Sequence, residues 1–137
     1  MAHKYFDDLF KKAKYKPPYP TEICDEDKKD KRHKQWKKER KKYGFDNRET
    51  WNLNTNFYVW LYERLKMYKK HASKIVDLTF YKFEYEGETL TQIECIDRMI
   101  EGCKLYIEDD ENDDKEVQKK INDVAKIWAM VLPCMWW

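Results

Sequence analysis

The sequence has few glycines, few prolines and no long apolar stretch, and each shortage excludes a class of protein. Three glycines in 137 residues are too few for the many tight turns of a β sandwich or barrel. No apolar run approaches the roughly 18 residues that a membrane-spanning helix needs. The start, MAHKYFDDLF, carries two acids and no long apolar stretch, so we expect no signal peptide. These shortages favour a mainly helical cytoplasmic protein that does not contact the membrane.

The sequence also lacks the spacings that build metal and catalytic sites. No two of the four cysteines lie two to four residues apart, and the three histidines follow no ligand spacing. No glycine-rich loop is present to bind a phosphate. Cys95 and Cys103, two turns apart on one expected helix, are interpreted as small core residues. We therefore expect no enzyme: no catalytic residue, no metal and no cofactor.

Aromatic and charged residues are plentiful, and the charges are unevenly distributed. The 6 Trp, 10 Tyr and 6 Phe can supply a core despite the 39% of charged residues. The formal net charge of +2 conceals two blocks of opposite sign. Residues 28–42 contain ten basic and two acidic residues, and residues 108–116 contain seven acids and one lysine. Such blocks attract each other, within one chain or between copies, or they attract outside partners.

The first 43 residues are expected to form a basic N-terminal arm. Helical spacing of apolar residues predicts a short helix over 3–14, and the prolines of 16–20 impose an extended turn. A lysine-rich helix follows over 26–43. Its large apolar residues are so few, mainly Trp36 and Tyr43, that we expect it to be exposed to solvent.

Residues 44–137 are expected to form a helical core domain. Asp46 and Glu49 match a capping box that would open a helix of roughly 25 residues, whose apolar residues recur every three or four positions. Residues 75–86 alternate partially, which indicates one short extended or strand segment ending at Gly87. Two further boxes open two more helices. The first pairs Thr91 with Glu94 and opens a helix whose inward residues are Ile93, Ile96, Ile100, Cys103 and Ile107. The second pairs Asp113 with Glu116 and opens a helix that ends at Pro133. The predicted fold is mainly α: a small helical bundle with a basic arm.

One part of the chain resembles a known group of proteins. Its features are a Gly-aromatic-Asp start at 44–46 and the segments RETWNL at 48–53, LYERLK at 61–66 and IDRMI at 96–100. Over about residues 43–108, and in the Trp-ended C terminus, the chain resembles small accessory proteins of tailed bacteriophages. This resemblance implies a viral protein in the cytosol of a host bacterium that binds a host or phage partner. It implies no particular chemistry.

The basic helix is a candidate nucleic-acid site. Its cations would contact phosphates while Trp36 stacks on a base. The alternative is a solvated helix, or one paired with acids. The candidate residues are Lys31, Arg32, Lys34, Trp36, Lys37, Lys38 and Lys41.

Two groups of acids have simpler interpretations. The loop at 108–114 lacks the glycine that a calcium-binding EF-hand loop requires at its sixth position, so we interpret it as a solvated connection between helices. Glu94, Asp97 and Glu101 share one helix face. A magnesium site there would need a second pair of carboxylates, which is missing. We expect a solvated face neutralised by Arg98 and Arg64.

The C terminus is the other candidate site. Trp136 and Trp137 either dock on the long helix or project into a partner, and Trp51 with Asn52 forms a second candidate binding face. The favoured function is a non-enzymatic binding protein that acts through protein–protein contacts, with a host factor as a candidate partner. The alternatives are a nucleic-acid-binding or virion-associated protein, and self-association through the opposite charge blocks.

Overall fold

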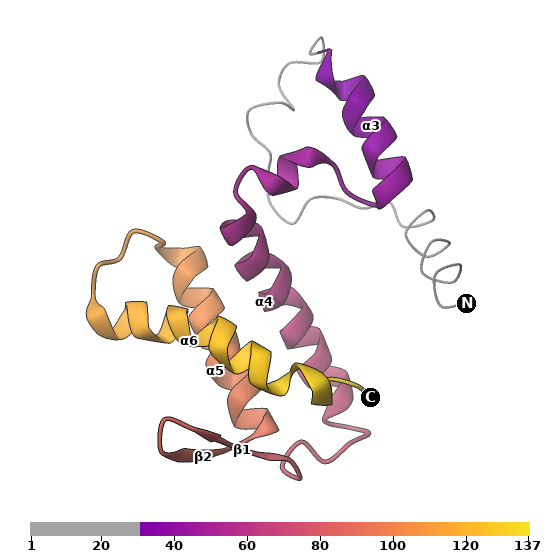
Figure 1. The fold of residues 1–137 in the computed structure, drawn as a ribbon. Coiled ribbons are helices and arrows are strands. Elements are labelled where there is room, and N and C mark those ends of the chain that lie inside the picture. Colours follow the sequence, from indigo (N-terminus) through magenta and orange to yellow (C-terminus); the bar gives the residue numbers. More distant parts are fainter. Residues whose placement is uncertain (1–30) are drawn as a thin grey trace. The chain divides into compact units, whose positions relative to one another are not determined.

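The computed structural model describes residues 31–137, which are mainly helical with one small antiparallel sheet (Figure 1). This confirms the predicted fold class. The described residues form two compact units, 31–56 and 57–137. The predicted helix 3–14, the proline segment 16–20 and the start of the basic helix lie outside the described residues. The boundary predicted after residue 43 stays a prediction, while the contacts divide the chain after Asn56.

The first unit consists of helix α3 (Arg32–Tyr43), the 3₁₀ helix η1 (Asn47–Thr50) and the start of α4 (Leu53–Ala72). Gly44 ends α3 in a left-handed conformation with φ of 85°, and its N–H donates to the Arg40 carbonyl. The predicted capping box does not open α4. Asp46 instead caps η1 by accepting a hydrogen bond from the Arg48 N–H. A turn then separates η1 from α4, which begins at Leu53, six residues later than a helix capped by Asp46 would begin.

The second unit is built around the C-terminal part of α4 together with α5 (Gln92–Glu108) and α6 (Lys115–Val131). Each helix contributes fully or almost fully buried apolar side chains. These are Leu61, Leu65 and Ala72 from α4, Cys95, Ile96, Met99 and Cys103 from α5, and Val124, Ile127 and Val131 from α6. The core roles predicted for Cys95 and Cys103 are thus confirmed. The inward position predicted for Ile107 is wrong, because this side chain near the end of α5 is 44% exposed.

The helix caps agree with the sequence in one case and differ by one residue in another. Thr91 and Glu94 form the predicted capping box at the start of α5. At α6, however, Asp114 is the cap, because its side chain accepts from the N–H groups of Glu116 and Val117. The predicted cap, Asp113, lies one residue too early. No helix of residues 31–137 combines the length and the apolar character that crossing a membrane requires.

A β hairpin joins α4 to α5. Strand β1 (Lys82–Tyr85) pairs antiparallel with β2 (Glu88–Thr91) through a turn at Glu86 and Gly87. Both turn residues have positive φ, 49° and 80°, as in the turns that suit the twist of a two-residue hairpin. The extended segment predicted over 75–86 is therefore a strand only from Lys82, and β2 was not predicted. The loop before β1 is held to α5 by the N–H of Ile93, which donates to the Leu78 carbonyl at 3.0 Å.

Candidate functional site

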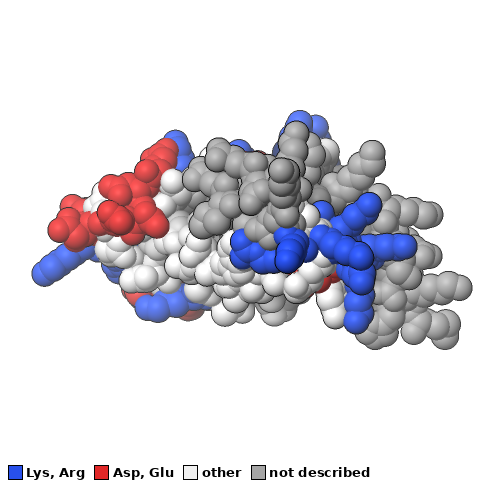
Figure 2. All heavy atoms as spheres, turned by 90° about the horizontal axis from the view of Figure 1, so that it is seen from above, with Lys and Arg blue, Asp and Glu red and all other residues white. Residues whose placement is uncertain are grey.

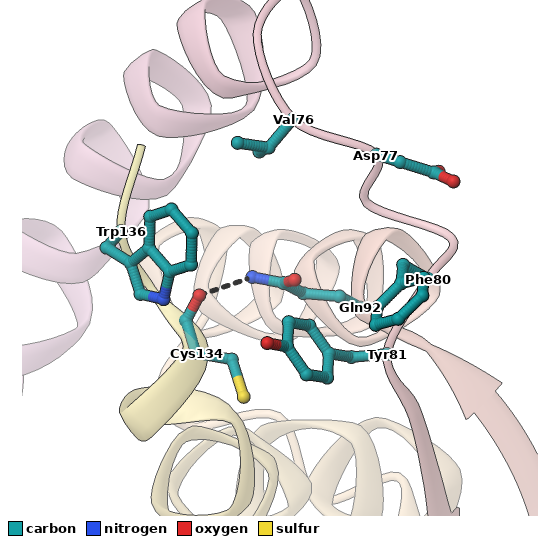
Figure 3. Close-up of a pocket in the computed structure, with 7 residues that line it drawn as sticks. All are labelled: Val76, Asp77, Phe80, Tyr81, Gln92, Cys134 and Trp136. Atoms are coloured by element: carbon teal, nitrogen blue, oxygen red, sulfur yellow. Dashed lines mark hydrogen bonds between the residues drawn. The ribbon is translucent and has the colours of Figure 1, made fainter.

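An apolar cleft lies in the second unit where the C-terminal segment meets the loop before the hairpin. It has a volume of about 230 Å³. Figure 3 shows Trp136 on one side and Phe80 on the other, with Gln92 and Tyr81 between them. Its lining residues come from three segments that are distant in sequence: Val76, Asp77, Phe80 and Tyr81, then Gln92, then Cys134 and Trp136.

Gln92 holds the C-terminal segment at the wall of this cleft. Its side chain is almost fully buried at the first position of α5. The Gln92 amide donates to the Cys134 carbonyl at 3.1 Å (Figure 3) and to the Tyr68 hydroxyl at 3.3 Å. That hydroxyl in turn donates to the Trp136 carbonyl at 2.9 Å. The backbone of the C-terminal segment is thus fixed to α4 and α5 at two carbonyls, those of Cys134 and Trp136.

The aromatic side chains at the cleft remain exposed although the backbone is held. Phe80 is 73% exposed and Trp136 is 61% exposed. Trp137 is 58% exposed and stacks on His71, with ring centroids 5.6 Å apart. The first alternative predicted for the terminal tryptophans, docking on the long helix, is therefore observed for the backbone of their segment, and projection into a partner stays a prediction. Their segment docks on the long helix, and the indole of Trp136 still presents most of its surface to solvent.

Asp77 is the charged residue of the cleft lining. Its Oδ1 accepts hydrogen bonds from the Thr79 hydroxyl at 2.6 Å and from the Thr79 N–H at 2.9 Å. The bond from the hydroxyl has the larger effect, and together the two bonds hold the pKa of Asp77 below its ordinary value. The carboxylate is therefore ionised at neutral pH. It points away from the other lining side chains (Figure 3). The interior of the cleft is consequently apolar, with a negative charge at its edge.

Trp51 and Asn52, the second predicted binding face, belong to the first unit. Asn52 is exposed. Trp51 is 44% exposed and packs edge to face on Trp36, with ring centroids 6.2 Å apart. The guanidinium of Arg32 lies 5.8 Å from the Trp51 ring centroid. The predicted partner-binding residues therefore lie in separate units, and only Trp136 lines the apolar cleft.

The structure corrects the predicted role of Trp36. This side chain is fully buried, and its indole N–H donates to the Asn47 side chain at 2.8 Å. The guanidinium carbon of Arg48 lies 4.4 Å from its ring centroid, and the ring of His33 packs against it at 5.1 Å. Trp36 therefore anchors α3 and has no open face on which a nucleic-acid base could stack. The rest of α3 is largely exposed, as expected, and Trp36 is its one buried side chain.

A buried ionic cluster lies beneath α3. The Asp46 carboxylate accepts hydrogen bonds from the guanidinium of Arg48, two at 2.9 Å, and from that of Arg40 at 2.6 Å. Burial alone would raise the pKa of Asp46, but these hydrogen bonds together keep it below its ordinary value. The sequence indicated Asp46 only as a helix cap and gave no sign that Arg48 is buried, because the segment that carries them is not periodic.

Two acids on this face of α5 are paired with lysines of neighbouring helices, while Glu94 belongs to the capping box. The side chain of Asp97 accepts from Lys69 at 2.6 Å, and that of Glu101 accepts from Lys120 at 2.8 Å. These lysines, and not the predicted Arg98, neutralise the face. Arg98 pairs instead with Glu88 of the hairpin.

The acidic loop is exposed at every acid, as expected. In the part of the chain that the structure describes, no group of three or more His, Cys, Asp and Glu side chains could hold a metal ion.

Burial raises the pKa of Cys95 to about 11 and that of Cys103 to about 12, so both thiols are protonated at neutral pH and are poor nucleophiles.

Comparisons of the chain with models of protein families, with curated proteins and with solved structures find no match. The resemblance to accessory proteins of tailed bacteriophages therefore stays a prediction.

Proposed function

We propose that the protein is a non-enzymatic binding protein of the cytosol that captures a partner protein at the cleft beside Trp136. The observation that carries this proposal is an exposed tryptophan on a fixed backbone next to an apolar cleft. Tryptophan is among the residues most enriched at the energetic centres of protein interfaces. The carbonyls of Cys134 and Trp136 are already hydrogen-bonded, so the backbone of this segment is held in place before a partner binds. Partner binding therefore loses little further backbone freedom, which lowers its entropic cost.

The size and lining of the cleft favour a protein side chain as its occupant. Small-molecule and cofactor sites usually measure about 300–1,000 Å³, which exceeds the 230 Å³ of this cleft. The interior is formed by Val76, Phe80, Tyr81 and Trp136, so an apolar or aromatic side chain would gain most from entering it. The carboxylate of Asp77 at the edge favours a basic neighbour of that side chain in the partner.

Replacing Trp136 by alanine is expected to weaken partner binding by roughly thirtyfold, since an interface tryptophan typically contributes about 2 kcal/mol or more. The measurement is a capture of proteins from a nuclease-treated bacterial lysate on the full-length chain. It is followed by titration calorimetry with the protein that is captured. The same experiment with Trp137→Ala provides a matched control, because Trp137 is equally exposed but lies outside the cleft lining.

The proposal requires that the two variants differ. A protein retained by the original chain and by Trp137→Ala, but not by Trp136→Ala, supports it. Equal retention by both variants would place the partner elsewhere, and loss of all retention after nuclease treatment would mean that nucleic acid bridged the two proteins. Circular dichroism of each variant verifies that the helices persist.

A further inference from the structure

A second surface of the protein is strongly and uniformly basic. Each residue of an α helix turns by about 100° around the axis. The lysines of α3, together with Lys31 just before it, therefore fall within an arc of about 140° on the side opposite Trp36. All of them are exposed. We call this surface the lysine face, and it consists of Lys31, Lys34, Lys37, Lys38, Lys41 and Lys42. Figure 2 shows a group of Lys and Arg side chains on the surface.

Two of the three acids of residues 31–56 are occupied elsewhere. Glu39 accepts hydrogen bonds from Gln35 and from the N–H of Asn47, both at 2.8 Å. Asp46 is buried with its two arginines. Within residues 31–137 no ion pair involves a lysine of the lysine face.

Such a face costs the helix stability. Lys34 and Lys38, Lys37 and Lys41, and Lys38 and Lys42 are like-charged pairs four residues apart. Each pair destabilises a helix by roughly 0.2–0.5 kcal/mol. A helix that needs charge only for solubility mixes the two signs. An unmixed face on a helix that is anchored from behind by Trp36 indicates a polyanionic partner.

We propose that the lysine face binds the phosphate backbone of double-stranded nucleic acid without reading the base sequence. This is a second binding activity, independent of the cleft at Trp136. From Lys31 to Lys42 the helix rises about 16 Å, which corresponds to about five phosphates of one strand along a duplex axis. The face therefore matches the length of a short stretch of backbone, with slightly more than one lysine for each phosphate.

The chemistry of the face argues against base recognition. The rigid, planar guanidinium of arginine suits the bidentate contacts that read bases better than the flexible lysine ammonium does, but the arginines of α3 lie on the Trp36 side. Arg32 lies over the Trp36 and Trp51 rings at 5.2 and 5.8 Å, and Arg40 pairs with Asp46. Single-strand binding normally relies on aromatic stacking. Trp36 is buried, and Tyr43 projects about 20° from it around the helix, away from the lysines.

Binding of the full-length chain to a fluorescent duplex of about two helical turns tests the proposal by anisotropy at several salt concentrations. With five phosphates neutralised, log K should fall against log salt with a slope of about −4.5. The variant Lys34→Ala, Lys38→Ala, Lys41→Ala should reduce that slope by about 3 and weaken binding at low salt by about tenfold or more. Duplexes of different sequence should bind alike.

Two further variants make the test specific. The triple change to arginine at the same positions keeps the charge and should preserve the slope. A charge-matched control removes three exposed lysines of the second unit, Lys70, Lys74 and Lys126, and should leave the slope nearly unchanged. Circular dichroism verifies that each variant keeps its helices.

Other results would overturn the proposal. Absence of duplex binding at low salt, or an equal loss in the control triple, would show that the lysine face is not the site. Salt-sensitive self-association that the alanine triple abolishes, without duplex binding, would instead assign the face to the acidic loop of a second copy. Strong preference for one duplex sequence would contradict binding through the backbone alone.

Discussion

Replacing Gly102 by alanine is expected to lower the melting temperature of the second unit by roughly 12–24 °C, which corresponds to about 3 kcal/mol. Gly102 is buried on α5 where α6 crosses it. A Cβ at this position would lie 2.6 Å from the Lys120 carbonyl oxygen and even closer to Cγ2 of Val124. The carbonyl of Lys120 is fixed in the backbone of α6 and cannot rotate away as a side chain could, so α5 and α6 would have to move apart.

The sign of this change is diagnostic. In an exposed helix, glycine to alanine usually stabilises by about 1 kcal/mol, so an increase in melting temperature would show that the two helices do not approach closely at Gly102. The neighbouring variant Glu101→Ala removes only an exposed ion pair with Lys120 and should cost no more than about 1 kcal/mol. At Gly87, where a Cβ would meet no atom within 4 Å but φ is +80°, alanine should cost roughly 1 kcal/mol through backbone strain alone.

The sequence predicted those elements whose residues repeat regularly. The apolar period of α5 and its capping residues, Thr91 and Glu94, identify that helix and its start. Single-residue choices are harder: Asp113 and Asp114 are chemically equivalent caps in the sequence, and only the backbone conformation of Asp114 selects it. The β2 strand was missed because its alternation is short and because Glu86, not a typical turn residue, adopts a positive φ.

The candidate sites were predicted only in part, for a related reason. Trp136 was identified by its chemistry, but the opposite wall of its cleft was not. Phe80 and Tyr81 reach it through a loop whose path depends on tertiary hydrogen bonds, such as that from the N–H of Gln92 to the Tyr81 carbonyl at 3.2 Å. Trp36 appeared exposed because α3 has a thin apolar stripe. The chain after Gly44 folds back and covers Trp36 with the side chains of Asn47 and Arg48. These residues are polar, so the spacing of apolar residues in the sequence does not predict this contact.

Replacing Asp46 by alanine is expected to destabilise the first unit by about 3–5 kcal/mol, the usual cost of breaking a buried ion pair. The buried guanidinium of Arg48 would lose both hydrogen bonds that it donates to this carboxylate. Arg40 would lose its ion pair, and η1 would lose its cap. Hydrogen exchange of the α3 amides and of the Trp36 indole N–H measures the effect on this unit. The variant Asp109→Ala, which changes an exposed acid of the second unit, is the charge-matched control and should leave those protons protected.

The same carboxylate predicts how the first unit responds to acid. Because the pKa of Asp46 in the folded protein lies below its ordinary value of 3.8, the unfolded chain takes up the proton first as pH falls. The stabilisation is therefore complete above about pH 4 and is lost as pH falls through the lower folded value. Trp36 indole protection should decline in that range in the original protein. In Asp46→Ala it should already be weak at neutral pH and should change little with acid. An identical acid response in both proteins would show that other carboxylates control the stability of this unit, and normal protection in Asp46→Ala at neutral pH would show that the anchoring of α3 rests on Trp36 and its indole hydrogen bond to Asn47.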